Sequence, residues 1–102
     1  MSQFDVYKHA IDATTHALLL DIQSDLIGII DTRVVVPLVH ASRAPSAATR
    51  LNPTISVNSH SYIALFQDIQ SVYTDTLGAR VGNAGQHGYD VTVALDLLFQ
   101  GY

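Results

Sequence analysis

Five histidines are the side chains of this chain most able to act as acids, bases or metal ligands near neutral pH. They are His9, His16, His40, His60 and His87, with no pair at i, i+4 and no cysteine anywhere in the chain. Zinc sites need such spacings, so the sequence predicts no metal site. It also lacks the glycine-rich phosphate loops and the G-x-S-x-G nucleophile motif, so we expect no cofactor.

One enzymatic alternative stays open, a ribonuclease in which an arginine holds phosphate while a histidine or aspartate moves a proton. Arg33, Asp25, His40 and His60 could meet in a small barrel. The chain has nine Asp, no Glu and five Lys or Arg, for a net charge of −4. Such acidity argues against direct nucleic-acid binding. The sequence therefore favours a binding protein over an enzyme.

Length and composition are typical of one folded domain, which we place at residues 1–102. Of the 102 residues, 48% are hydrophobic and 14% charged, which excludes the disordered class. The absence of cysteine fits a reducing compartment. No signal-peptide pattern opens the sequence, and no apolar run is long enough to cross a bilayer. We expect a cytoplasmic protein without membrane contact, and dimerisation would help so small a domain.

Short strands are predicted wherever apolar and polar residues alternate or β-branched residues cluster. They cover residues 3–8, 17–23, 32–39, 53–57, 61–66 and 72–74. Pro37 cannot donate to a sheet, so the third strand should end or bulge there, or lie at an edge. Residues 77–86 contain Gly78, Gly82 and Gly85 and are predicted to be flexible.

The last stretch predicts an amphipathic helix that begins near residues 86–87. Val91, Ala94, Leu95 and Leu98 fall at i, i+3, i+4 and i+7, which is one apolar face. The end of this helix either completes the core or enters a partner. Together the elements predict an α+β, mainly β fold, a small barrel with a helix packed on it.

Residues 26–31 predict a loop with large apolar side chains, interrupted by Gly28. Loops rarely expose such side chains without a reason. Leu26 and Ile27 could form a contact surface, whereas Ile29 and Ile30 fit better as a plug at one end of the barrel.

Five segments, taken in order, resemble the CcdB family of toxins. They are residues 3–7 (QFDVY), 21–27 (DIQSDLI), 33–38 (RVVVPL), 51–53 (LNP) and 96–102 (DLLFQGY). The resemblance implies an SH3-like barrel of about five or more antiparallel strands with a C-terminal helix, assembled as a homodimer. It also implies a non-enzymatic toxin of a toxin–antitoxin module, such as those that maintain plasmids. Such toxins trap the DNA gyrase A subunit on cleaved DNA, and a CcdA-like antitoxin with a disordered tail neutralises them.

The resemblance also transfers site residues. The positions that match the family's gyrase contacts are Leu26, Ile27, Asp96, Phe99, Gln100, Gly101 and Tyr102. The antitoxin loops correspond to residues 9–16 and 40–52, where Arg43 and Arg50 are the candidates.

Three positions depart from the best-known member, with Gln100 in place of Trp, Tyr102 in place of Ile and Asp96 in place of Asn. Losing an aromatic anchor commonly costs about 2 kcal/mol or more at an interface. Tyr102 could take over that role. The alternatives are a weakened toxin, an mRNA-cleaving toxin on the same barrel, or a non-toxic relative that still binds antitoxin.

Overall fold

Seven strands and one α-helix make up the described part of the chain, which comprises residues 1–9, 18–27, 30–43 and 50–101 of a computed structural model. The strands are β1 Asp5–His9, β2 Leu18–Asp21, β3 Thr32–His40, β4 Thr54–Val57, β5 His60–Ala64, β6 Gln70–Tyr73 and β7 Leu77–Asn83, and α1 Gly88–Gln100 follows. Short 3-10 turns are η1 Ala41–Arg43, η2 Phe66–Asp68, η3 Thr74–Thr76 and η4 Gly85–His87.

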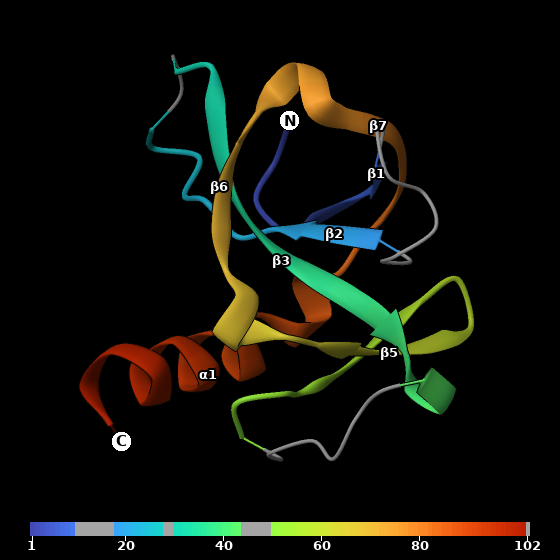
Figure 1. Ribbon diagram of the computed structural model, residues 1–102, viewed down its shortest axis with the longest axis vertical. Helices are drawn as coiled ribbons and strands as arrows, with labels where there is room; N and C mark the ends of the chain where they lie inside the picture. Colours follow the sequence, from blue (N-terminus) through green and yellow to red (C-terminus); the bar gives the residue numbers. More distant parts are fainter. Residues whose placement is uncertain (10–17, 28–29, 44–49, 102) are drawn as a thin grey trace.

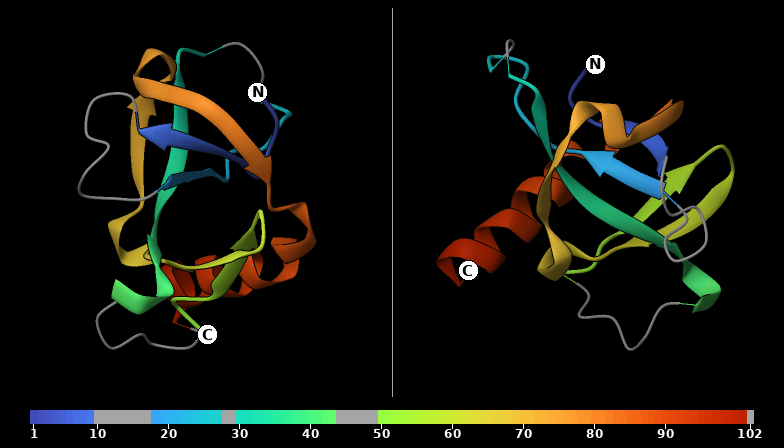
Figure 2. Two further views of the ribbon diagram at one scale, coloured as in Figure 1. Left: turned by 90° about the vertical axis from the view of Figure 1, so that its right-hand side faces the viewer. Right: turned by 45° about the horizontal axis from the view of Figure 1, so that its top comes forward.

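The strands form one antiparallel sheet that curls on itself (Figures 1 and 2). Their order is β4-β5-β3-β2-β1-β7, while β6 pairs with the first half of β3. The two outer strands meet where Asn58 Nδ2, in the β4–β5 turn, donates to Val81 O of β7 at 2.8 Å. The result is a half-barrel with one C-terminal helix, so the predicted α+β, mainly β fold is confirmed.

The β4–β5 hairpin follows from its two turn residues. Val57 pairs with His60, and the two residues between them, Asn58 and Ser59, have φ values of 51° and 69°. Positive φ at both positions is the mark of a type I′ turn, whose twist matches that of the flanking strands, and Asn tolerates it well. The local sequence therefore sets the place of this hairpin.

Pro37 lies inside a central strand, which the sequence reasoning did not expect. It pairs with Leu19 of β2, and β3 continues without a register shift to His40. On its other side β3 changes partner, because Val35 is the last residue that pairs with β6, opposite Gln70, and Leu38 is the first that pairs with β5, opposite Ala64. Pro37 therefore lies at the gap between β6 and β5, where neither strand has an acceptor that its missing N–H would have to bind.

The prediction that residues 77–86 are flexible is wrong for the part that forms β7, which pairs with β1. The glycines allow a close approach. A Cβ on Gly78 would lie 2.8 Å from the backbone oxygen of Lys8, and one on Gly82 would lie 3.3 Å from Val57 Cγ1. Glycine here serves tight strand packing instead of disorder.

Helix α1 packs its first half against the open side of the sheet, beside the β4–β5 hairpin (Figure 2). Val91 and Ala94 are buried with Phe66 in the core, and Leu95 packs against it. The helix ends at Gln100 and is capped by Gly101, whose φ is 82° and whose N–H donates to Leu97 O at 3.0 Å. Gly is the usual residue at such a left-handed helix end.

We expect Gly78→Ala to destabilise the fold by about 1–3 kcal/mol, because the new Cβ must push β1 and β7 apart. Urea unfolding measures the loss. Gly88→Ala is the matched control, since its Cβ would meet Phe4 at an ordinary 3.5 Å. Gly88 lies in α1, so this control should be neutral or more stable. If the Gly78→Ala variant is as stable as the wild type, the close approach of Lys8 is not what requires glycine at position 78.

Candidate functional site

A short turn after β2 carries the most exposed large apolar side chain among the described residues. Leu26 is 97% exposed and Ile27 is 50% exposed. The turn is nonetheless ordered by its own bonds, since Leu26 N–H donates to Ser24 Oγ at 3.1 Å and Ile27 N–H donates to Ser24 O at 3.2 Å. Its apolar side chains are therefore held out from the fold.

Two further exposed apolar side chains lie near this turn. Ile30 is 50% exposed and precedes β3 by two residues, so the described structure does not support its predicted role as a barrel plug. Ile29, for which the same role was predicted, lies outside the described residues. Tyr73 is 66% exposed and stands opposite Thr32, the first residue of β3. Sequence reasoning missed Tyr73, because only the pairing of β6 with β3 brings it here. We call Leu26, Ile27, Ile30 and Tyr73 the turn patch.

The end of α1 presents the other predicted group. Phe99 is 66% exposed, Asp96 and Gln100 are exposed, and Leu98 is half-buried. Gly101 was predicted as a gyrase contact from the family resemblance, and in the structure it also caps the end of α1. Tyr102 lies outside the described residues.

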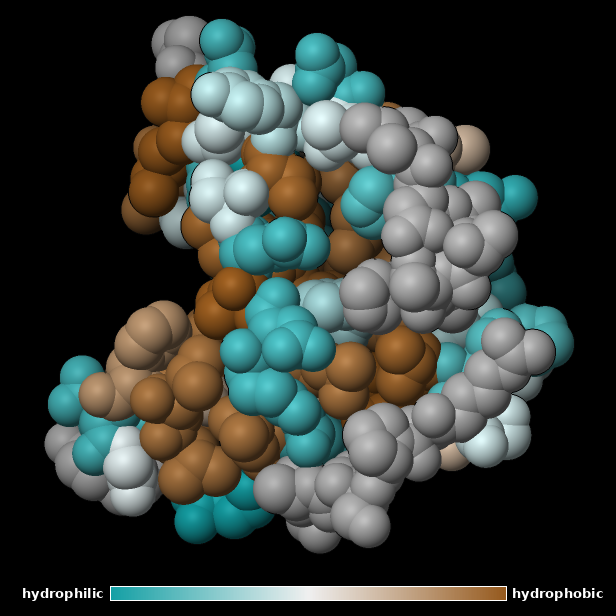
Figure 3. Space-filling model, viewed as in Figure 1, coloured by the Kyte–Doolittle hydropathy of each residue, from teal (hydrophilic) through white to brown (hydrophobic). Residues whose placement is uncertain are grey.

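The turn patch and the end of α1 lie on the same side of the molecule (Figures 1 and 3). Figure 3 shows apolar surface over both, with a hollow between them. The last turns of α1 also project beyond the sheet (Figure 1). The fold thus brings the two predicted segments, far apart in sequence, to one face.

A buried charged network fastens the turn to the sheet. Arg33 Nε donates to Asp21 Oδ2 at 2.7 Å, and Arg33 Nη2 donates to Gln23 O at 3.2 Å and lies 3.8 Å from Asp25 Oδ1. Burial raises the pKa of Asp21, while the hydrogen bonds from Arg33 and from the Gln23 N–H oppose that rise. Gln23 Nε2 is buried and has no hydrogen-bond partner among the described residues.

A second network surrounds Asp5 at the start of β1. Its carboxylate accepts from the Ser2 N–H, Arg80 Nε and Asn83 Nδ2 at 2.9, 2.9 and 3.0 Å. Burial raises the pKa of Asp5, but these hydrogen bonds and the Arg80 charge outweigh it and lower the pKa to about 2. Gln3 joins the two networks, because its N–H donates to Asp25 and its C=O accepts from Asn83.

The four residues considered for ribonuclease chemistry do not gather at one place. Arg33 and Asp25 meet at the first end of β3, whereas His40 ends that strand. Seven residues of strand separate Arg33 from His40, which is roughly 23 Å. His60 begins β5 and belongs to the His40 end, since His40 pairs with Tyr62. In residues 1–9, 18–27, 30–43 and 50–101, no three His, Asp, Glu or Cys are placed to hold a metal ion.

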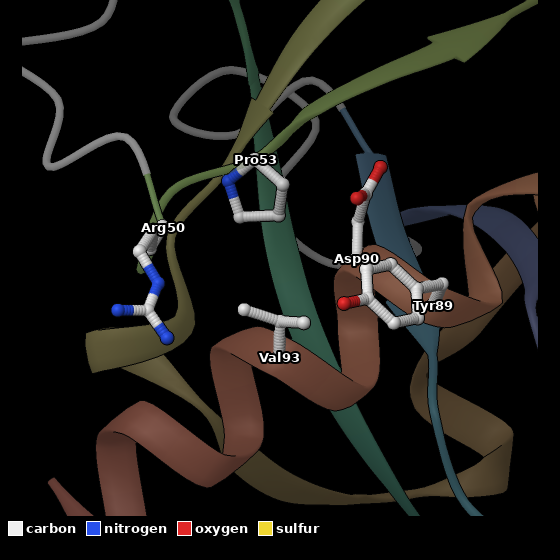
Figure 4. A pocket seen from close by; sticks show the side chains of 5 residues that line it. All are labelled: Arg50, Pro53, Tyr89, Asp90 and Val93. Atoms are coloured by element: carbon white, nitrogen blue, oxygen red, sulfur yellow. The ribbon is translucent and has the colours of Figure 1, made fainter. Parts of the chain in front are cut away.

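Arg50, one of the two residues predicted to bind antitoxin, lines a pocket of about 330 Å³ (Figure 4). The pocket lies between the residues that precede β4 and the first half of α1. Pro53, Tyr89, Asp90 and Val93 complete the lining. The pocket therefore combines a cation, an anion and apolar walls. The side chain of Arg43 and residues 10–16 lie outside the described residues.

Solved structures with this architecture include two mycobacterial proteins. One is an endoribonuclease in complex with its cognate antitoxin, with 13% identity over 98% of this chain and 95% of that one and a TM-score of 0.80. The other is an endoribonuclease, with 13% identity over 98% and 91% of the two chains and a TM-score of 0.75. At this identity the likeness shows a shared fold.

The fold and a family comparison together identify the class of protein as the toxins of toxin–antitoxin modules. Residues 3–101 match the family described as CcdB protein. The chain belongs to the CcdB family. No helix in the described segments is long and apolar enough to cross a membrane.

The comparison with solved structures corrects one prediction. The resemblance implied a protein that is not an enzyme, whereas the two solved structures described above, which share the fold, are endoribonucleases. The prediction that the protein is not an enzyme is therefore overturned, because proteins with this fold include endoribonucleases.

We expect Asp5→Asn to lower the free energy of unfolding by roughly 2 kcal/mol near pH 6. The pKa of Asp5 is depressed to about 2 from an ordinary 3.8, so its stabilising effect is present above pH 4. It is lost as the pH falls toward 2. Urea unfolding of both proteins from pH 6 to pH 2 should show the difference shrinking, and a constant difference would contradict the assignment.

Proposed function

We propose that this protein is a toxin that binds the DNA gyrase A subunit through the turn patch and the end of α1, and traps gyrase on cleaved DNA in the cytoplasm. The carrying observation is the exposure of Leu26 on an ordered turn, on the same side as Phe99. Single exposed apolar side chains are ordinary on a protein surface, but a group on one face marks an interaction site.

The energetics of the turn patch favour a protein partner. Burying one Leu or Ile side chain is worth about 1.5–3 kcal/mol. Tyr73 and Phe99 add aromatic anchors, which dominate interface energies. Gln100, where the family's best-known member has Trp, is exposed on the last turn of α1. Tyr73 is a candidate to supply part of the aromatic contact that Gln100 cannot.

A homodimer is part of the same proposal. The last turns of α1 project beyond the sheet, with Leu98 half-buried and Phe99 exposed. A second copy related by a two-fold axis near the end of α1 would cover Leu98, leave Phe99 exposed and repeat the turn patch on both sides of the axis.

An antitoxin with an acidic, apolar segment would fit the Arg50 pocket. Arg50 and the buried Pro53 lie on one wall, while Tyr89 and Val93 come from α1 (Figure 4). A carboxylate can pair with the guanidinium of Arg50 while an apolar side chain enters the pocket. One of the proteins that share this fold was solved with its cognate antitoxin, which supports a partner of this kind.

RNA cleavage is the second candidate, favoured by the fold shared with two endoribonucleases. No catalytic group is assigned, because Arg33 is buried in a pair with Asp21 and His40 lies at the far end of β3. An RNA substrate would have to use a surface other than this buried pair.

We expect the double substitution Leu26→Ala with Ile27→Ala, or Phe99→Ala alone, to weaken binding to the gyrase A subunit tenfold or more, since an anchor is worth about 2 kcal/mol. Surface plasmon resonance on the purified subunit measures the change. Thr92→Ala is the matched control, because Thr92 is exposed on α1 yet lies in its first half.

Three outcomes separate the candidates. Folded variants that bind as tightly as the wild type would refute the gyrase surface. If micromolar protein cleaves RNA, and the Leu26→Ala with Ile27→Ala variant still does so, the function is RNA cleavage and not gyrase binding. Neither gyrase binding nor RNA cleavage by the wild type would leave a non-toxic relative.

For the antitoxin pocket, we expect Arg50→Ala and Tyr89→Ala each to weaken binding of the antitoxin encoded in the same module about tenfold, through a lost ion pair and a lost aromatic wall. Calorimetry with purified antitoxin measures this. Gyrase binding by both variants serves as the control and should not change. Unchanged antitoxin affinity in both variants would place the antitoxin elsewhere.

A further inference from the structure

We infer that Arg33 is a positioning residue, which holds the turn after β2 in the conformation that presents Leu26 and Ile27 to the partner. This inference rests on the proposed function, because it concerns the same turn patch. Arg33 itself is only 5% exposed, so it acts on the partner through the turn.

The guanidinium of Arg33 reaches three alternate residues of the segment that leads into the turn, Asp21, Gln23 and Asp25. Its Nε donates to Asp21 Oδ2 at 2.7 Å, and its Nη2 donates to the backbone oxygen of Gln23 at 3.2 Å. The same Nη2 lies 3.8 Å from Asp25 Oδ1. Only a planar fork can address separate acceptors in this way. The three residues alternate along the segment that ends at Asp25, immediately before Leu26, so the fork sets where the turn leaves the sheet.

Further bonds hold the same segment from other sides. Asp25 Oδ1 accepts from the N–H of Gln3 at 2.8 Å. Gln23 Oε1 accepts from the N–H of Val34 at 3.1 Å, and the Gln23 N–H donates to Asp21 Oδ1 at 3.0 Å. The turn therefore cannot swing without breaking several of these bonds together.

Folding stability alone does not account for this arrangement. A buried ion pair often adds no more stability than well-packed apolar side chains would, because both charges lose their hydration. Gln23 Nε2 is buried without a partner among the described residues, which is unfavourable. The 97% exposure of Leu26 is unfavourable as well. Unfavourable features that cluster at one place are typical of a functional site.

Positioning explains what these features have in common. A binding loop that is ordered before it meets its partner loses less conformational freedom on binding. The buried pair keeps the turn ordered, while the turn keeps Leu26 in solvent. The affinity of the turn patch then depends on Arg33 even though the partner never touches it.

Arg33→Lys is the discriminating variant. Lysine keeps a positive charge beside buried Asp21, so the protein should still fold, but one ammonium cannot reproduce the fork toward Gln23 and Asp25. We expect the amide order parameters of Leu26 and Ile27 in the free protein to fall from about 0.85 to below about 0.6. Dissociation from the gyrase A subunit should become about tenfold faster.

Arg80→Lys is the matched control. Arg80 Nε donates to Asp5 Oδ1 at 2.9 Å, so the same chemical change is made in a second arginine–aspartate pair. The Arg80→Lys protein should have the same order parameters at Leu26 and Ile27, and the same dissociation rate from the gyrase A subunit, as the wild type. In the background of Leu26→Ala with Ile27→Ala, Arg33→Lys should cause no further loss, because the side chains it positions are gone.

The outcomes are distinct. A folded Arg33→Lys protein with an ordered turn and unchanged dissociation overturns the inference and leaves the proposed function standing. If Leu26→Ala with Ile27→Ala does not weaken gyrase binding, the proposed function fails, and the order parameters still decide whether Arg33 holds the turn. If Arg33→Lys does not fold by circular dichroism, Asp25→Ala, at an exposed carboxylate, undergoes the same two measurements with the same expected direction.

Discussion

The buried pair of Asp21 and Arg33 is the contact on which the exposed surface of this protein depends. It joins the last residue of β2 to the second residue of β3 across 2.7 Å. Neither charge could remain buried alone at an acceptable free energy. Keeping the pair therefore keeps the two strands in register, and it fixes the direction in which the turn between them leaves the sheet.

Helix α1 holds an exposed apolar side chain in place at the other end of the same face. Its first half is anchored by Val91 and Ala94 in the core, and its second half continues past the sheet as a rigid extension. Because an α-helix is stiff over this length, burial of one half positions Phe99 on the other. Two ordinary features of folding, a buried pair and a half-buried helix, thus hold apolar side chains in solvent.

The shared fold with endoribonucleases illustrates how little a barrel of this kind says about chemistry. Function depends on the side chains placed on the fold, and 13% identity leaves almost all of them free to differ. In this chain Arg33 is enclosed by Asp21 and Gln23, whereas His40 stands at the opposite end of β3. Residue types that suggest one active site in the sequence are here parts of separate structures.

The sequence by itself determined what depends on near neighbours along the chain: the period of the strands, the Asn58-Ser59 turn, the apolar face of α1 and the five segments that identify the family. Tertiary structure alone decided what depends on partners across the sheet. Pro37 is tolerated only because β3 changes neighbours there, and Gly78 belongs to a strand only because Lys8 approaches it so closely. Tyr73 joins the turn patch, and Arg33 reaches the turn, through register between strands, which no local pattern encodes.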